Sequence, residues 1–434
     1  MEYLFSAIVL IIISLIFVDL KIGVSLYLIY TILVPYDLLL FSMNSSTFIQ
    51  FAIVLSIFIR GGKYFKNNSF QDILKPFLPI LLLFIILFCF TPFQQYVPFG
   101  QEFTYFQYEI RQFFILPFAI WCITNHDAKA VKAINIAIII ASIVVFAYEF
   151  YLLSNNGVNY YLLFLSNLTG NEVKDVMLGY DDSRFMVRAC STFAHSMNYA
   201  LFLIMDYVFI LSIKDKINKG LWFALLACCI VCIFTSNVRS AIVAFVVASA
   251  FYVLLMRNGK VAIAFVIGAI ILVSVIDQIP EFKVFMESLY KQGADVEGSS
   301  WDIRLKQLEG CFVEISDCHL FGKGYDWTTY YIAQHHTHPV ILAFESVIFK
   351  YLCNWGWLGL ILYVFAYYRF ASYSYKIMRA RPEKIQCLSL IVVFLTYCIA
   401  TGDFNYTQYF MPIYALFLAN HHKTQYLSCK IQKS

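Results

Sequence analysis

The sequence has few charged residues. Only 13% of its 434 residues are Asp, Glu, Lys or Arg, whereas soluble domains carry about 25%. So few charges leave too little polar surface to cover one or two globular domains, which excludes soluble enzymes, disordered proteins and nucleic-acid-binding proteins. With 61% hydrophobic residues and a mean hydropathy of +0.72, the composition predicts a polytopic membrane protein.

The apolar segments do not alternate polar and apolar residues, which excludes the short strands of a membrane barrel. They are long and continuous, as after Ala7 and after Pro79, so we expect each to satisfy its backbone as a helix. The N-terminus has no basic region or small-residue cleavage site and does not resemble a removable signal peptide. We predict an all-α protein with about 12–13 transmembrane helices, at 3–18, 22–41, 46–59, 76–90, 105–124, 131–153, 191–213, 220–236, 239–256, 261–279, 350–368, 385–402 and 404–420.

Lys and Arg are distributed unevenly between the two sides of the predicted bundle. Short loops on one side, with Lys21 and the tail after residue 421, hold 20 of the 31 basic residues, so this side is predicted to be cytoplasmic. Two longer segments, about 154–190 and 280–349, are then outside, and the second holds 11 of the 27 acidic residues if Asp277 is counted.

Neither outer segment has the Ser, Gly and Pro bias of a linker, so we expect partly helical structure on the membrane surface rather than a floppy connector. We therefore divide the chain into three parts. They are an N-terminal transmembrane bundle (1–279, with the outer loop 154–190), a large outer loop (280–349), and C-terminal spans with a cytoplasmic tail (350–434).

Two arginines on the outer side lie where an unpaired charge is expensive. Arg239 follows a three-residue break between two spans, where it either reaches lipid headgroups or binds an anionic substrate. Apolar residues follow Arg304 at i+4, i+7 and i+11, so Arg304 lies on the apolar face of a predicted amphipathic helix. A guanidinium on such a face needs an anionic partner, either an internal carboxylate or a substrate phosphate.

A third arginine, Arg188, opens the segment RACSTFAHSMNYALFL (188–203), where an outer loop enters a span. His195 and Asn198 follow at i+7 and i+10, so the three residues are predicted to lie near one helical face. A polar face at the mouth of a bundle indicates a lined cavity, and a solvated helix N-terminus is the alternative.

Three histidines, His335, His336 and His338, precede the next span. Their spacing differs from that of zinc sites, and no carboxylate or thiolate accompanies them at a regular interval, so we predict no metal and no cofactor. A neutral imidazole outside the membrane can act as general base on a hydroxyl, which makes His338 a candidate. Glu345, seven residues on, is a second candidate base or a group that orients a histidine.

Three segments match the motif pattern of one known family. RACSTFAHSMNYALFL is similar to the pattern Arg-x-x-Gly-Thr-Phe-x-x-Pro-Asn-x-x-Ala at the entry to a span, and TSNVRSAIVAF (235–245) to a Ser-Arg-Gly/Ser-Ala turn. The stretch from Arg304 through Gly322 and Gly324 to Gly356-x-x-Gly359 is similar to a large periplasmic loop and the span after it. Together they resemble the O-antigen polymerase (Wzy-type) and O-antigen ligase superfamily of bacterial inner-membrane glycosyltransferases.

The sequence departs from the family pattern in two places. Cys190 stands in place of the usual Gly, and Ser196-Met197 in place of a Ser/Pro-type pair. In the ligases a His-x-Asn/Ser/Gly triplet stands nine residues before Gly-x-x-Gly, whereas this chain has Phe344-Glu345-Ser346 there. The nearest histidine, His338, lies outside that register, which favours a polymerase over a ligase.

The resemblance implies an enzyme that transfers a growing glycan from undecaprenyl pyrophosphate to a sugar hydroxyl of another lipid-linked repeat unit. The reaction would take place at the periplasmic face of the bacterial inner membrane and yield an O-antigen or a capsular polysaccharide. Both lipid-linked glycans and the bilayer are then partners, with a chain-length regulator as a further candidate and no nucleic acid. The implied catalytic residues are Arg304, His338 and Glu345. Pyrophosphate or glycan binding is assigned to Arg188, Arg239, His195, Asn198, His335 and His336.

Three other functions remain as alternatives, one of which is a noncatalytic accessory membrane subunit that only binds glycan. An O-antigen ligase would use the same donor with lipid A-core as acceptor. A flippase or transporter for the lipid-linked unit would belong to a different class. Transporters tend to have repeated halves and short outer loops, whereas this chain has no internal repeat and devotes about 70 residues to one outer loop.

Overall fold

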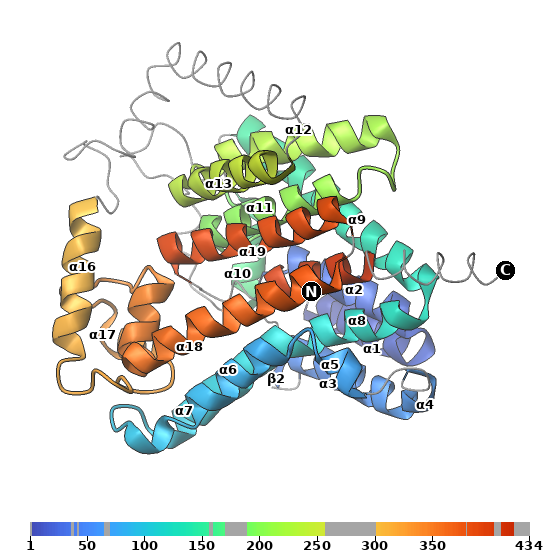
Figure 1. Cartoon of the computed structure of the whole chain (residues 1–434). Coiled ribbons are helices and arrows are strands. Elements are labelled where there is room, and N and C mark those ends of the chain that lie inside the picture. The colour runs from blue at the N-terminus through green and yellow to red at the C-terminus, as the bar shows by residue number, and fades with distance from the viewer. Residues whose placement is uncertain are drawn as a thin grey trace, which may run out of the picture.

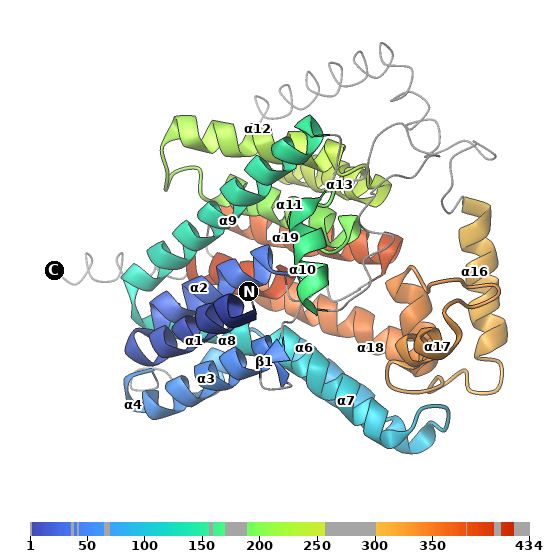
Figure 2. The same ribbon diagram turned by 180° about the vertical axis from the view of Figure 1, so that it is seen from behind.

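The computed structural model describes residues 2–35, 39–40, 43–64, 70–155, 159–169, 189–256, 301–378, 380–402 and 409–420. Within these residues the chain is a bundle of apolar helices with one hairpin of two short strands, each two residues long. This architecture confirms the predicted all-α polytopic membrane fold. Figures 1 and 2 show most of the long helices running along a common direction, with α16 lying across one end of the bundle.

The N-terminal half supplies the helices that form one side of the bundle. The hairpin pairs β1 with β2 in antiparallel register just before α3. The elements are α1 (Glu2–Val18), α2 (Leu20–Leu33), β1 (Leu39–Leu40), β2 (Met43–Asn44), α3 (Ser45–Ile59), α4 (Gly61–Tyr64), α5 (Phe70–Leu74), α6 (Leu78–Phe88), η1 (Thr91–Phe93), α7 (Phe99–Ile110), η2 (Arg111–Ile115), α8 (Leu116–His126), α9 (Ala128–Ser154) and α10 (Tyr160–Thr169).

The second half supplies the helices that pack on α9 and α6 and those of the large loop. They are α11 (Ser196–Ser212), α12 (Lys219–Thr235), α13 (Arg239–Met256), α16 (Trp301–Glu314), α17 (Trp327–His335), α18 (Val347–Ile377), α19 (Arg381–Thr401) and a last helix at Tyr409–Asn420. The predicted span at 261–279 lies outside the described residues.

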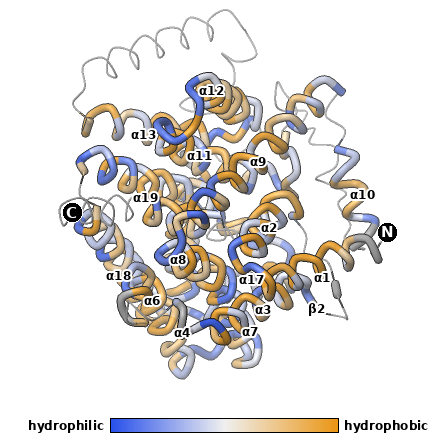
Figure 3. Tube along the Cα trace, turned by 90° about the vertical axis from the view of Figure 1, so that its right-hand side faces the viewer, coloured by the Kyte–Doolittle hydropathy of each residue, from blue (hydrophilic) through white to orange (hydrophobic). Residues whose placement is uncertain are grey.

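By length and composition, four of the described helices are long and apolar enough to cross a membrane: α9, α13, α18 and α19. Seven shorter apolar helices of 10–17 residues accompany them. Figure 3 shows apolar residues along most of the helices and polar residues in connections such as the one between α11 and α12. These helices coincide with most of the predicted spans.

Two predicted spans differ in detail, and proline explains both differences. The span at 22–41 ends at Leu33, because Val34 precedes Pro35 and is therefore held in an extended conformation. The span at 105–124 is divided into α7, a π-helical turn and α8. Pro117 has no N–H to donate to the carbonyl four residues earlier, which disrupts the ladder at this turn.

The two ends of the bundle have different compositions. We call the end that carries residues 301–346 the loop end. The opposite end, which we call the basic end, carries the connection 213–218 with Lys21, Arg60 and Arg381. Lys21 forms ion pairs with Asp19 and Asp127 there, and Arg381 donates to the Leu255 carbonyl at 2.8 Å. The basic residues named here, which were predicted to share one side, therefore lie at one end.

The described part of the large loop is partly helical, as predicted, and has a small core of its own. α16, α17 and the beginning of α18 enclose this second apolar cluster, separate from the main core of the bundle. Its buried members include Cys311, Ile315, Trp327, Phe344 and Leu352. The described part of the loop is thus a folded layer on the bundle rather than a floppy connector.

Candidate active site

Two glycines allow the loop to contact α18 backbone to backbone. Gly356 has φ +65° and ψ −163°, which breaks α18 and directs the Trp357 N–H to the His319 carbonyl at 2.9 Å. A Cβ at Gly356 would lie 2.5 Å from the His319 oxygen, and one at Gly322 (φ +69°) would lie 2.5 Å from the Asn354 carbonyl carbon. Side chains at these positions would separate the two segments, so the glycines of the motif are explained by packing and backbone geometry.

The turn between α6 and α7, together with the beginning of α7, forms hydrogen bonds to this same contact between the loop and α18. The Gln94 amide donates to the Asn354 carbonyl at 2.9 Å and also to the Phe321 carbonyl. The buried Glu102 carboxylate accepts from the Tyr325 N–H at 3.0 Å. The loop end is therefore held by α7 and α18 together.

Arg304 has the anionic partner that its position on an apolar face requires. Its guanidinium donates to the Glu345 carboxylate at 3.1 Å and to the Glu345 backbone carbonyl. Both side chains are partly exposed, at 23% for Arg304 and 32% for Glu345. In this structure the partner is the internal carboxylate, one of the two alternatives that the sequence allowed.

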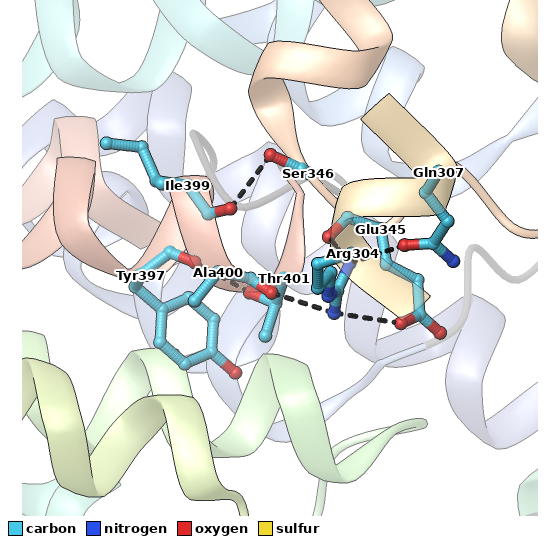
Figure 4. Close-up of polar contacts among 8 residues, drawn as sticks. All are labelled: Arg304, Gln307, Glu345, Ser346, Tyr397, Ile399, Ala400 and Thr401. Atoms are coloured by element: carbon cyan, nitrogen blue, oxygen red, sulfur yellow. Dashed lines mark hydrogen bonds and ion pairs between the residues drawn. The ribbon is translucent and has the colours of Figure 1, made fainter. Parts of the chain in front are cut away.

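The end of α19 completes the site. Arg304 also donates to the Ala400 carbonyl at 3.1 Å, and the Ser346 hydroxyl donates to the Ile399 carbonyl at 2.8 Å (Figure 4). Both carbonyls lie in the last turn of α19, where backbone oxygens lack partners within the helix and carry partial negative charge. Three segments distant in sequence thus converge on one guanidinium.

Burial lowers the pKa of the Arg304 guanidinium, and the adjacent Glu345 carboxylate acts in the opposite direction. Arginine remains charged after such a shift, because its pKa starts far above neutrality. The site is therefore a fixed cation beside a carboxylate at the boundary between the loop and the bundle. Such a pair can bind a phosphate on the cation and accept a proton on the carboxylate.

A second charged group lies within the loop layer. The Glu314 carboxylate accepts from Lys323 at 2.5 Å and contacts Nε2 of His338 at 3.2 Å. Burial acts to raise the pKa of Glu314, but the hydrogen bonds from Lys323 and His338 outweigh it, so this pKa lies below its usual value. The Lys323 ammonium also lies over the ring of Trp327, 5.0 Å from its centroid.

His338 is almost fully buried, and both of its ring nitrogens have partners. Nδ1 accepts from the backbone N–H groups of Val340 and Ile341 at 3.2 and 3.0 Å, and Nε2 faces Glu314. The ring therefore makes its contacts to the chain rather than to an open surface.

The predicted polar face of Arg188, His195 and Asn198 is not formed in the way the spacing indicated. Arg188 lies outside the described residues, and α11 begins only at Ser196. His195 is the N-cap of α11, where its Nδ1 accepts from the Met197 N–H at 3.1 Å. A capping residue is extended rather than helical, so i+7 counting from Arg188 does not place His195 on a shared helical face.

Arg239 is half-buried at the beginning of α13. The bond from Arg381 to Leu255 joins the beginning of α19 to the end of α13, so these two helices are antiparallel. The beginning of α13 therefore lies at the loop end, where the last turn of α19 holds Arg304. The start of α11 is at this end too, because the Tyr397 hydroxyl donates to the Met197 carbonyl at 2.6 Å.

His335 and His336 are exposed at the end of α17. The His335 ring packs on Tyr331 with 4.5 Å between centroids, and His336 ends the helix with φ +62°. Within the part of the chain that the structure describes, no group of three His, Cys, Asp or Glu side chains is arranged to hold a metal ion.

Sequence reasoning did not identify two parts of the site. Gln307 is fully buried one turn after Arg304, and its side-chain oxygen lies 3.4 Å from that guanidinium. Its i+3 spacing could have revealed it, because it shares the face of Arg304. The carbonyls of α19 could not have been found, because a backbone group leaves no side-chain signature.

An apolar helical bundle with a charged, folded loop docked across its end defines a polytopic membrane protein, with the candidate site where the loop meets the bundle. Residues 224–364 match the model of the family described as O-antigen ligase, and this match confirms the resemblance to the O-antigen polymerase and ligase superfamily. Members of this family are glycosyltransferase-like enzymes. The matched segment contains Arg239, Arg304, Glu345 and Gly356, and Arg188, His195 and Asn198 precede it. Comparison with curated proteins gave no significant match.

Proposed function

We propose that this protein polymerises undecaprenyl-pyrophosphate-linked oligosaccharide repeat units at the periplasmic face of the bacterial inner membrane. The observation that most supports the proposal is the partly exposed Arg304–Glu345 pair at the loop end, which combines a cation and a base. Both reactants are lipid-linked, and a site at the membrane boundary lets their sugars meet while the lipid tails remain in the bilayer.

In the proposed reaction Arg304 binds the donor pyrophosphate through its planar donor fork. The phosphate competes with Glu345 for the guanidinium, which frees the carboxylate to accept the proton of the acceptor hydroxyl. The hydroxyl oxygen then bonds to the anomeric carbon, and the bond from that carbon to the pyrophosphate oxygen breaks. The electron pair leaves with the pyrophosphate, whose growing charge is stabilised by Arg304 without a metal.

Other predicted residues have supporting roles in this proposal. Arg239, at the same end of the bundle, supplies further positive charge for the pyrophosphate, and the same role is assigned to Arg188. The polar side chains His195, Asn198, His335 and His336 are assigned to the glycan.

Of the two predicted bases, Glu345 is the one we assign to the proton transfer. It directly contacts Arg304, whereas both ring nitrogens of His338 are already bonded. Phe344 stands where the ligases have a histidine, and the absence of that histidine supports the polymerase over the ligase. The ligase remains the second candidate, because the matching family model is described by that name.

A deletion strain separates the two functions on a lipopolysaccharide gel. Loss of a polymerase should leave lipid A-core with a single repeat unit, and the wild-type gene should restore the ladder. Bare core, with polymer retained on its carrier lipid, would contradict the polymerase and support the ligase. An unchanged ladder would contradict both.

A further inference from the structure

The turn before α18 is built around the His338 ring. Two antiparallel backbone bonds join His338 and Leu342, each of 3.0 Å, and inside this turn Nδ1 accepts from Val340 and Ile341. One lone pair of Nδ1 therefore satisfies two N–H groups that the turn would otherwise leave without acceptors. This arrangement requires the neutral ring that carries its proton on Nε2, and that proton faces Glu314.

The turn leads directly into the Glu345 segment. Leu342 and Phe344 both have positive φ, at 60° and 53°, a strained conformation that such residues keep only where the surroundings hold them. The buried Phe344 ring packs against the His338 ring, with 5.5 Å between centroids. Ser346 then caps α18, and Glu345 lies between the strained segment and the cap.

We propose that His338 is a positioning residue: its ring folds the 338–342 turn and thereby holds Glu345 against Arg304. This role rests on the proposed function for its effect on chain growth. The role is distinct from that of a general base, because Nδ1 acts as an acceptor for backbone N–H groups and Nε2 donates to Glu314. Neither nitrogen exchanges a proton with substrate.

Three substitutions of His338 distinguish the role of Nδ1 from that of Nε2. In His338→Asn the side-chain oxygen can replace Nδ1 as acceptor for the two N–H groups, because Asn forms this kind of turn. In His338→Gln the longer side-chain amide reaches the place of Nε2 and retains the contact with Glu314. It does not replace Nδ1 as the acceptor that forms the turn. His338→Ala removes both. The full-length protein is studied in membranes of a deletion strain for polymer and in detergent for hydrogen exchange.

We expect His338→Asn to keep at least half of the wild-type polymer and slow exchange at the amides of Val340 and Ile341. His338→Ala and His338→Gln should lose polymer about tenfold and exchange these amides at least tenfold faster. If Asn is as inactive as Ala while its amides remain protected, His338 transfers a proton and the positioning role is wrong. If Ala retains slow exchange, the turn does not depend on the ring and the proposal also fails.

The exchange measurement separates this proposal from the proposed function. If the protein is not a polymerase, Arg304→Lys and all three His338 variants will leave polymer unchanged, yet exchange will still increase in Ala and Gln. If only the positioning role is wrong, Arg304→Lys will still greatly reduce polymer, and the His338 variants will show one of the two contradicting results given above.

Discussion

The arginines Arg60 and Arg381 at the basic end have a different kind of partner from Arg304 at the loop end. At the basic end Arg60 and Arg381 donate to backbone carbonyls at the ends of helices, those of Val18 and Leu255. At the loop end Arg304 and Lys323 each face a carboxylate from a different segment of the chain.

The difference indicates which substitutions each arginine can tolerate. A carbonyl at a helix end carries diffuse negative charge that any nearby cation can satisfy, so geometry matters little at the basic end. At the loop end one guanidinium spans a carboxylate and the end of α19, and a lysine has neither the planar fork nor the number of donors. We therefore expect substitutions of the same type to have unequal effects at the two ends.

The largest expected effect is that of Gly356→Ala, because it separates the loop from the bundle. The added Cβ meets the His319 oxygen at 2.5 Å and the residue must keep φ +65°, for a combined cost of about 3 kcal/mol or more. We expect little folded protein by fluorescence-detected size-exclusion chromatography. Gly100→Ala is the control, because a Cβ at Gly100 has no atom within 4 Å. Normal yield of Gly356→Ala would mean that the backbone contact does not hold the loop.

The next largest effect is on activity. The same substitution, arginine to lysine, is made at each end so that the two ends can be compared directly. Arg304→Lys should reduce polymer on the order of 100-fold, as does the loss of one donor to a developing negative charge, while the protein still inserts. Arg381→Lys should remain within about twofold of wild type. Both are measured by lipopolysaccharide ladders at equal membrane abundance. Equal ladders in the two variants would remove Arg304 from the mechanism.

The smallest effect concerns the pH dependence of stability at the loop end. The pKa of Glu314 lies below its usual value of about 4.5, so its stabilising contacts are present above that pH and lost as pH falls through the lowered pKa. Glu314→Gln should cost about 1–2 kcal/mol at pH 7, and less below pH 4. Thermal unfolding in detergent between pH 7 and pH 3 measures the difference. A constant difference across this range would mean that the carboxylate contributes no charge-dependent stability.

Much of the fold was predictable, because apolar runs of this length have few alternatives to a membrane helix. The sequence also indicated that Arg304 lies on a buried face and needs an anion. It did not indicate that Glu345 is this anion, because the two residues are 41 positions apart and no periodicity connects them. The capping role of His195 was missed because the helix begins later than the spacing suggested.

The bond between Gln94 and Asn354 has a consequence for biosynthesis. The two residues are 260 positions apart, and ribosomes add about 5–20 residues per second. The corner between α6 and α7 therefore waits roughly 13 to 52 s after its own synthesis before its partner emerges. During that interval the Gln94 amide must be satisfied by groups other than the Asn354 carbonyl, so this part of the loop end can reach its final form only late in synthesis.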